Sequence, residues 1–224
     1  MRWAPRREKF IVPTTNSCCL IVYAKAPVPG QVKTRLVPAL DFEAAALLHT
    51  ALVERALSTA KRSGIAAIEL CCAPDSRHGF FRSCAEDFNV VLTEQGEGHL
   101  GERMLRTLTR ALMSHQSAII IGADCPALTG KHIADAARAL STHDVVLTPA
   151  EDGGYVLIGS RGVELHLFDD IEWGSDKVLA QQRRNLEKAG LTWHEMPTLW
   201  DVDRPADLPR LKALKPSLEF FWPS

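Results

Sequence analysis

Short apolar runs alternate along the chain with longer amphipathic stretches, and this alternation predicts strands that are followed in turn by helices. The runs that predict strands are residues 18–23, 67–72, 90–93, 118–121 and 144–148, with a further short strand starting at Tyr155. The stretches that predict helices are residues 42–63, 76–88, the segment after the glycine-rich turn through His115, 129–140 and 175–189. Alternating β and α patterns predict an α/β fold with a mostly parallel sheet and helices on both faces.

The length of 224 residues suits one α/β domain, and no linker marks a second. Residues 1–16 are basic and without periodicity, so we expect a loose N-terminal arm before a single domain at 17–224. A basic start followed by an apolar run also imitates a secretory signal. That run is short, and cleavage after it would remove an informative loop, so we expect a cytoplasmic protein.

Composition excludes several classes of protein. Lysine and arginine number 26 and acidic residues 27, so the net charge of -1 provides no general attraction for nucleic acid. No apolar run approaches the about 20 residues that span a membrane. Six cysteines occur without a CxxC spacing, which favours buried free thiols over a zinc site or a disulfide framework.

The apolar run at residues 118–121 ends abruptly, with Gly122, Asp124 and Pro126 following it. The pattern predicts a buried central strand that presents Asp124 at its carboxyl end. Ligands of open α/β sheets bind outside the carboxyl ends of the strands, so Asp124 is a candidate ligand for a divalent metal. Alternatively, Asp124 caps the next turn. The adjacent Cys125 has no identifiable activating partner, which disfavours a nucleophilic role.

The loop at residues 24–36, AKAPVPGQVKTRL, follows the first predicted strand and precedes the first predicted helix. Lys25, Lys33 and Arg35 bring three cations to this junction, and Thr34 adds a hydroxyl donor. Cations and backbone N–H groups at such a junction suit a diphosphate or a triphosphate. Neither the P-loop nor the dinucleotide-binding fingerprint is present. A solvated basic loop is the alternative interpretation.

The glycine-rich segment at residues 95–103 could approach a nucleotide closely. Gly96, Gly98 and Gly101 allow backbone contact, and the helix that follows has free N–H groups. Glycines also simply make turns, so both interpretations stay open. His99 could contact a ligand, although a single loop histidine is more often only solvated.

Residues 148–159, TPAEDGGYVLIG, place Glu151 and Asp152 before two glycines. This carboxylate pair could bind metal, orient a sugar hydroxyl or act as a general base. An Asp-Gly pair is equally a strong β-turn signal. Farther along, Ser175 is a candidate N-cap of the last predicted helix, and Trp173 either stacks on a ligand or packs in the core.

The segment at residues 199–208, LWDVDRPADL, contains two aspartates two positions apart. In an extended segment the carboxylates of Asp201 and Asp203 face the same side. Pro205 suits the first turn of a helix, which makes Asp203 a candidate N-cap as well as a candidate metal ligand.

Six segments together resemble the bacterial nucleotide-diphospho-sugar transferase family of the glycosyltransferase-A fold, some members of which are arsenosugar biosynthesis glycosyltransferases. The segments occur in the order found in that family: KAPVPGQVKTRL, QGEGHLGERM, GADCPAL, PAEDGGYVLIG, IEWGSDKVL and DVDRPADL. The KTRL segment with Pro38 also resembles 2-phospholactate guanylyltransferases, and DVDRPADL is similar to a segment of cytidylyltransferases. The resemblance spans about residues 20–211.

The resemblance implies a role for each matching position. The nucleotide-binding residues would be Lys25, Gly30, Lys33, Thr34, Arg35, Gly98, His99 and Gly101. Mg²⁺ or Mn²⁺ would be held by Asp124, with Asp203 as the more favoured second ligand and Asp201 behind it. Asp152 would be the base, and the sugar and acceptor side would have Gly153, Gly154 and Trp173. Arg204, Ala206 and His99 depart from the family pattern, which leaves the acceptor preference open.

Three hypotheses follow for the function. The first is a metal-dependent glycosyltransferase that uses a nucleotide sugar and a small-molecule acceptor. The second is a nucleotidyltransferase that uses a nucleoside triphosphate and releases pyrophosphate. The third is a nucleotide-binding protein without turnover. The oligomeric state is open, with a homodimer as one alternative.

Overall fold

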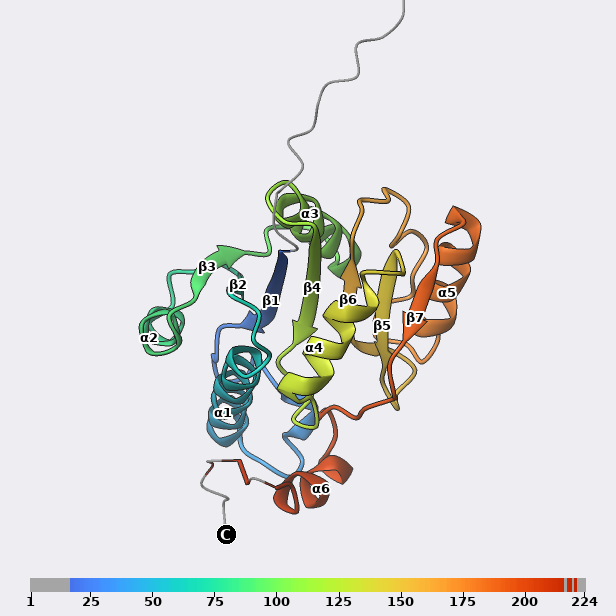
Figure 1. Ribbon diagram of the computed structural model, residues 1–224. Helices are drawn as coiled ribbons and strands as arrows, with labels where there is room; N and C mark the ends of the chain where they lie inside the picture. The colour runs from blue at the N-terminus through green and yellow to red at the C-terminus, as the bar shows by residue number, and fades with distance from the viewer. Residues whose placement is uncertain (1–16, 216, 219, 221–224) are drawn as a thin grey trace, which may run out of the picture.

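The computed structural model describes residues 17–215, 217–218 and 220 of the 224-residue chain. The expected N-terminal arm, residues 1–16, lies outside the described residues. Strands and helices alternate along most of the chain, as the apolar pattern predicts (Figure 1). The described strands are β1 (Cys18–Lys25), β2 (Ala67–Ala73), β3 (Val91–Glu94), β4 (Ser117–Gly122), β5 (Val145–Pro149), β6 (Tyr155–Ser160) and β7 (Trp193–Glu195).

The helices in the described part of the chain cover the sheet or its carboxyl edge. They are α1 (Phe42–Lys61), α2 (Gly79–Phe88), α3 (Leu100–Leu112), α4 (Gly130–Ala139), α5 (Val178–Ala189) and α6 (Leu208–Lys212). Two 3₁₀ turns lie at Thr34–Leu36 and Pro205–Asp207. Among the described residues, no helix is both long enough and apolar enough to cross a bilayer.

The described strands form one seven-stranded sheet in the order β3-β2-β1-β4-β6-β5-β7. β1 pairs in parallel with β2 and β4, whereas β6 lies antiparallel between β4 and β5. The predicted α/β fold with a mostly parallel sheet is therefore confirmed, and β4 is its central strand. Strand order reverses between β1 and β4, and open α/β sheets bind ligands at such a switch point.

Helices pack on both faces of the sheet, because successive strand residues point to opposite faces. Leu20 and Val22 of β1 belong to the core beneath α1, α2 and α4. Their neighbours Cys19 and Ile21 belong to the core beneath α3 and α5. A third apolar cluster joins the start of α1 to the C-terminal segment through buried Leu48, Trp200 and other residues.

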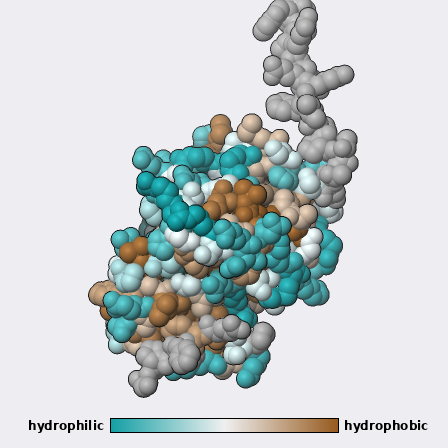
Figure 2. Space-filling model, turned by 90° about the vertical axis from the view of Figure 1, so that its left-hand side faces the viewer, coloured by the Kyte–Doolittle hydropathy of each residue, from teal (hydrophilic) through white to brown (hydrophobic). Residues whose placement is uncertain are grey.

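The face of the molecule in Figure 2 shows apolar areas between polar ones. The apolar side chains that α1 and β3 expose include Phe42, Leu47 and Val91. Apolar atoms make up more than half of the surface of an ordinary folded protein, so exposure of this kind is common.

Two helix starts differ from the prediction. The last long helix begins at Val178 rather than near Ser175, and its N-cap position is Lys177. The Ser175 hydroxyl instead accepts the N–H of Lys177 at 3.2 Å and donates to Glu172 O. The short helix predicted from residue 76 begins at Gly79, where His78 is the N-cap. The short strand β7 was not predicted, because it is too short to show a period. The helix α6 follows the turn at Pro205, where the sequence indicates a helix start.

Candidate functional site at the carboxyl ends of β1 and β4

A cavity of about 530 Å³ opens at the carboxyl ends of β1 and β4. The predicted site residues that line it are Lys25, Lys33, Thr34, Arg35, Asp124, Asp152, Gly154, Trp173 and Asp203. The tertiary fold thus brings together these side chains from five of the six sequence segments, which together span more than 170 residues. Gly30, Gly98, His99, Gly101, Gly153 and Asp201 do not line this cavity.

Lys33 lies at the centre of the charged end of the cavity. Its backbone is left-handed, with φ 51° and ψ 31°, which is unusual for a residue with a Cβ. The buried side chain reaches the far side of the loop, where Nζ lies 2.6 Å from Asp124 Oδ1 and donates to Val202 O at 2.6 Å. Lys33 therefore connects the loop after β1, the end of β4 and the segment that contains Val202.

Asp124 stands beyond the end of β4, where the sequence predicts it. Burial by itself would raise the pKa of Asp124, but Lys33, with His49 and Lys25, outweighs burial and keeps that pKa below its ordinary value. Oδ1 is enclosed beside Lys33, yet the side chain as a whole is 48% exposed. An ionised carboxylate thus keeps part of its surface available in the cavity.

The segment that contains the two aspartates runs alongside the end of β4, since Val202 N donates to Asp124 O at 2.9 Å. Asp203 points into the cavity and pairs with Arg35 at 2.7 Å. The prediction of Asp203 as a helix N-cap is wrong. Arg204 occupies that position, and the carboxylate of Asp207 accepts the N–H groups of Asp203 and Arg204. Pro205 starts the turn as predicted.

Carboxylates crowd around Asp201. Burial, together with the charges of Asp152 and Asp124, raises the pKa of Asp201 to about 6. Asp201 is half-buried behind the cavity, while Asp152 and Asp124 line it. A concentration of negative charge of this kind favours a cation nearby.

The loop between β5 and β6 carries Asp152 into the cavity on a tight turn. Asp152 Oδ1 accepts the N–H of Gly154 at 2.9 Å, and Ala150 N donates to Gly154 O. Gly153 has φ 90°, and a Cβ there would lie 2.2 Å from Asp176 O, so only glycine fits. The turn that the Asp-Gly pair predicts therefore exists, and it presents the carboxylate of Asp152 to the cavity. The other carboxylate of the pair, Glu151, faces outward to Arg210.

The glycine-rich segment turns from β3 into α3. His99 is the N-cap of α3 and forms a capping box with Glu102. His99 and Gly101 line a separate cavity of about 560 Å³, and Leu100 lines the main one. The proposed contact of this segment with a nucleotide stays a prediction.

Trp173 takes part in both of the arrangements that its sequence allows. It packs edge-on against Tyr155, with ring centroids 6.4 Å apart, and against Phe168 at 6.2 Å. It also lines the main cavity and the separate one. Cys125, in contrast, is buried, and burial raises the pKa of its thiol to about 12, so it has no thiolate to offer at neutral pH.

Several residues that line the cavity were not singled out by the sequence, among them Tyr23, His49, Gln95 and Arg103. His49 is 5% exposed, its Nε2 lies 2.9 Å from Lys25 O, and burial lowers its pKa. A histidine on the buried face of a predicted helix carries no signal that distinguishes a site residue from a core residue. Gln95 and Arg103 lie at the two ends of the glycine-rich segment. The sequence pattern of that segment indicates backbone contact through its glycines and says nothing of these two side chains.

The carboxylates at the cavity are the type of ligand that Mg²⁺ or Mn²⁺ prefers. Carboxylate oxygens suit these hard cations, and burial, together with the charges of Asp152 and Asp124, raises the pKa of Asp201 to about 6. Within the described residues, no three histidine, cysteine or acidic side chains gather closely enough to form a complete cage. Mg²⁺ commonly binds through one or two carboxylates together with substrate phosphates. Asp124 and Asp203 both line the cavity, where they pair with Lys33 and Arg35.

Comparison with protein families gives one match. The model of a family described as "uncharacterized protein conserved in bacteria (DUF2064)" matches residues 56–175, which is more than half of the chain. No curated protein matches the sequence.

Several solved structures are similar to this one. A protein from Desulfovibrio desulfuricans G20 described as a nucleotide-diphospho-sugar transferase has 27% identity and a TM-score of 0.80, with 90% of each chain covered. A nucleotidyl transferase from Methanothermobacter has 13% identity and a TM-score of 0.63, covering 89% of this chain and 97% of that one. Glucosyl-3-phosphoglycerate synthase from Mycobacterium tuberculosis, in complex with Mn²⁺ and uridine diphosphate, has 11% identity and a TM-score of 0.54, covering 88% and 75%. The last two show a shared fold.

Proposed function

Because this chain belongs to the DUF2064 family of bacterial proteins, and its charged cavity lies at the switch point of the sheet, we propose that it is a metal-dependent glycosyltransferase. The donor is a nucleotide-diphospho-sugar, and the acceptor is a small molecule. The similarity to the Desulfovibrio protein over 90% of both chains supports the donor class.

One observation carries the proposal: cationic and anionic side chains line the same cavity, where Lys33 pairs with Asp124 and Arg35 pairs with Asp203. Lys25, Lys33 and Arg35 come from the loop after β1, and the carboxylates come from three other segments. A site for phosphate alone would need only the cations. Carboxylates beside them are suited to phosphate that arrives with a divalent cation.

In this proposal the loop after β1 binds the diphosphate. Lys25 and Arg35 are exposed and Thr34 adds its hydroxyl, so these groups meet phosphate oxygens directly. Asp124 and Asp203 would hold Mg²⁺ or Mn²⁺, with Asp201 behind them. An ion held by these carboxylates would supply positive charge to the leaving diphosphate. Lys33 keeps Asp124 ionised and oriented toward the cavity.

Asp152 acts as the base for the acceptor hydroxyl. Its turn fixes the carboxylate through the N–H of Gly154, and its exposed side chain faces the cavity. Gly154 lets the acceptor and the donor sugar approach the backbone, and Trp173 offers an apolar wall. Gly153 supports this by allowing the tight turn beside Asp176.

Nucleotidyl transfer is the second candidate, and the number of cations on the loop after β1 supports it. Three cations and one hydroxyl on a single loop also suit the three phosphates of a nucleoside triphosphate. The same residues would then bind the β- and γ-phosphates, and pyrophosphate would leave.

A thermal-shift panel with product analysis tests the proposal. Nucleotide sugars, nucleoside diphosphates and nucleoside triphosphates are each added with and without Mn²⁺ to the wild type, to Asp124→Ala and to the surface control Lys131→Ala. A ligand that binds only the native state raises the melting temperature by mass action. We expect a Mn²⁺-dependent rise with nucleotide sugars that is retained in Lys131→Ala and lost in Asp124→Ala.

The product then distinguishes the reactions. Release of a nucleoside diphosphate supports glycosyl transfer, and release of pyrophosphate supports nucleotidyl transfer. A shift without either product supports a binding protein without turnover. No shift with any nucleotide contradicts all three.

A further inference from the structure

A second end of the cavity, to which the start of α3 contributes, differs in chemistry from the charged end. Apolar side chains line it, including Leu100 and Met104 of α3, Ile120 of β4 and Ile158 of β6. The polar groups at this end include Gln95 and the guanidinium of Arg103. Apolar walls with a few fixed polar groups are typical of a site for a flat heterocycle.

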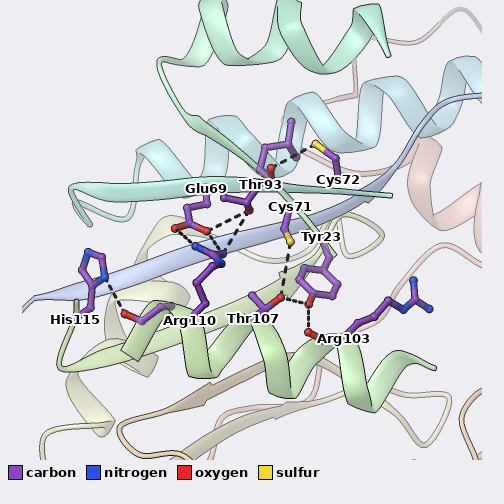
Figure 3. A network of polar contacts seen from close by, with 11 residues as sticks. Tyr23, Glu69, Cys71, Cys72, Thr93, Arg103, Thr107, Arg110 and His115 are labelled. Carbon is purple, nitrogen blue, oxygen red and sulfur yellow. Dashed lines mark hydrogen bonds and ion pairs between the residues drawn. The ribbon is translucent and has the colours of Figure 1, made fainter. Parts of the chain in front are cut away.

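Arg103 is fixed through its backbone. The Tyr23 hydroxyl donates to Arg103 O at 3.0 Å and lies 2.7 Å from the Thr107 hydroxyl oxygen. Figure 3 shows this network between β1 and α3, with the Arg103 guanidinium pointing away from it. The first turns of α3 are thereby held in place against the end of β1.

The guanidinium head is fixed separately, by Gln95. Gln95 is 4% exposed, and its Nε2 donates to Cys71 O at 3.0 Å and to Ala24 O at 3.4 Å. Because both Nε2 hydrogens face carbonyls, Oε1 is the atom that accepts from Arg103 Nη1, at 3.0 Å. The orientation of the amide therefore determines the orientation of the arginine.

The arginine has donors left over. Arg103 Nε is buried and has no hydrogen-bond partner among the residues that the structure describes. An arginine has five N–H donors and no acceptor, and Gln95 takes one of them. Leaving a buried donor without a partner costs free energy. A ligand that presents acceptors to the Arg103 side chain would remove that cost and so bind more tightly.

Resting on the proposed function, we propose that Arg103, held by Gln95, selects the nucleobase of the donor. It favours bases with two adjacent acceptors on one edge, which are guanine through O6 and N7 and cytosine through O2 and N3. Adenine places a donor beside each acceptor on its accessible edges, and an arginine fork cannot pair with that pattern. Uracil has an N–H between its two carbonyls.

The position of Arg103 relative to the phosphate loop agrees with this assignment. Gln95 contacts Ala24 O, and Lys25, the first cation of the phosphate loop, is the next residue. A base against Arg103 and a diphosphate against Lys25 are thus neighbours along one cavity. Phosphate itself has its own cations, so the acceptors that Arg103 meets come from another part of the ligand.

The experiment is a set of calorimetric titrations of the full chain with GDP, CDP, UDP and ADP in the presence of Mn²⁺. For the wild type we expect GDP or CDP to bind about tenfold tighter than ADP and UDP. In Arg103→Lys, which keeps the charge but loses the fork, this preference should fall to about twofold. Gln95→Leu should weaken the preference, because Arg103 loses the hydrogen bond to Gln95 Oε1 that orients it. The surface control Arg82→Lys should retain it.

The outcomes separate this inference from the proposed function. GDP binding tighter than CDP names guanine, and the reverse names cytosine. Equal binding of all four nucleotides to the wild type overturns the base selection and leaves the proposed function standing. The same holds for tightest binding of ADP or UDP, and for a preference that persists unchanged in Arg103→Lys. Failure of every nucleotide to bind the wild type overturns both.

Discussion

Replacing Lys33 by alanine should destabilise the fold more than the loss of an exposed lysine would. The Lys33 side chain is 6% exposed, and Nζ lies 2.6 Å from both Asp124 Oδ1 and Val202 O. The change leaves a carboxylate oxygen and a carbonyl without their donor in an enclosed position. Removing one partner of a fully buried ion pair costs about 3–5 kcal/mol.

The expected cost is lower than that range, because the Asp124 side chain is 48% exposed and water can solvate it in part. We therefore expect Lys33→Ala to lower the free energy of unfolding by about 2–3 kcal/mol. Lys33→Gly should be less harmful by about 0.5–1 kcal/mol, since glycine adopts the φ of 51° without strain but gains entropy in the unfolded chain.

The assay is urea unfolding at pH 7. The dependence of the unfolding free energy on urea concentration is compared between each variant and the wild type, to establish that unfolding exposes the same surface. Lys131→Ala is the matched control. Lys131 forms an exposed pair with Asp135 one helical turn away, and such pairs contribute at most about 0.5 kcal/mol. Two results would refute the reasoning: both Lys33 variants within about 0.5 kcal/mol of the wild type, or a glycine variant no more stable than the alanine variant.

Three further predictions concern other parts of the molecule. A Cβ at Gly122 meets no atom within 4 Å and would enter the cavity. Gly122→Val should therefore leave the unfolding free energy unchanged or raise it by about 0.5–1 kcal/mol. It should also abolish the thermal shift by nucleotides. An undiminished shift would contradict the assignment of this cavity as the nucleotide site. Burial would raise the pKa of Glu69, but Arg110 outweighs it and holds that pKa below its ordinary 4.5. The stability from this pair (Figure 3) is thus present above about pH 4.5 and lost as the pH falls through the lowered pKa. Urea unfolding of Glu69→Gln should accordingly differ from the wild type most near pH 7 and least in acid, and a difference independent of pH would count against the ion pair. Cys125, whose thiol pKa burial raises to about 12, should resist iodoacetamide in the native state and react after unfolding, as mass spectrometry of the labelled peptide would show; rapid native labelling would contradict its buried environment.

The sequence predicted the alternation of strands and helices well, because the apolar periods of the two kinds of element differ. It also located Asp124 just beyond the central strand, since a glycine, a carboxylate and a proline after an apolar run indicate where a strand stops. Helix starts were less certain. Both Ser175 and Asp203 are good N-cap residues by type, yet Ser175 bonds within a turn and Asp203 pairs with Arg35.

Contacts between distant residues depended on the tertiary structure. Arg35 and Asp203 are 168 positions apart, and Lys33 meets Val202 across 169. No local pattern encodes such pairs, because they result from the paths of two loops. The antiparallel insertion of β6 between β4 and β5 was equally invisible, as strand order is set by packing between elements.

The sequence by itself therefore determined the fold class, the strand ends and the types of charged group that reach them. Only the tertiary structure decided how those groups act on one another. Asp124 and Asp201 are chemically alike, but their pKa values differ. Asp124 is paired with Lys33, which lowers its pKa, whereas burial beside other carboxylates raises the pKa of Asp201 to about 6. The physical reason is that a pKa depends on burial and on neighbouring charges, which exist only once the chain has folded.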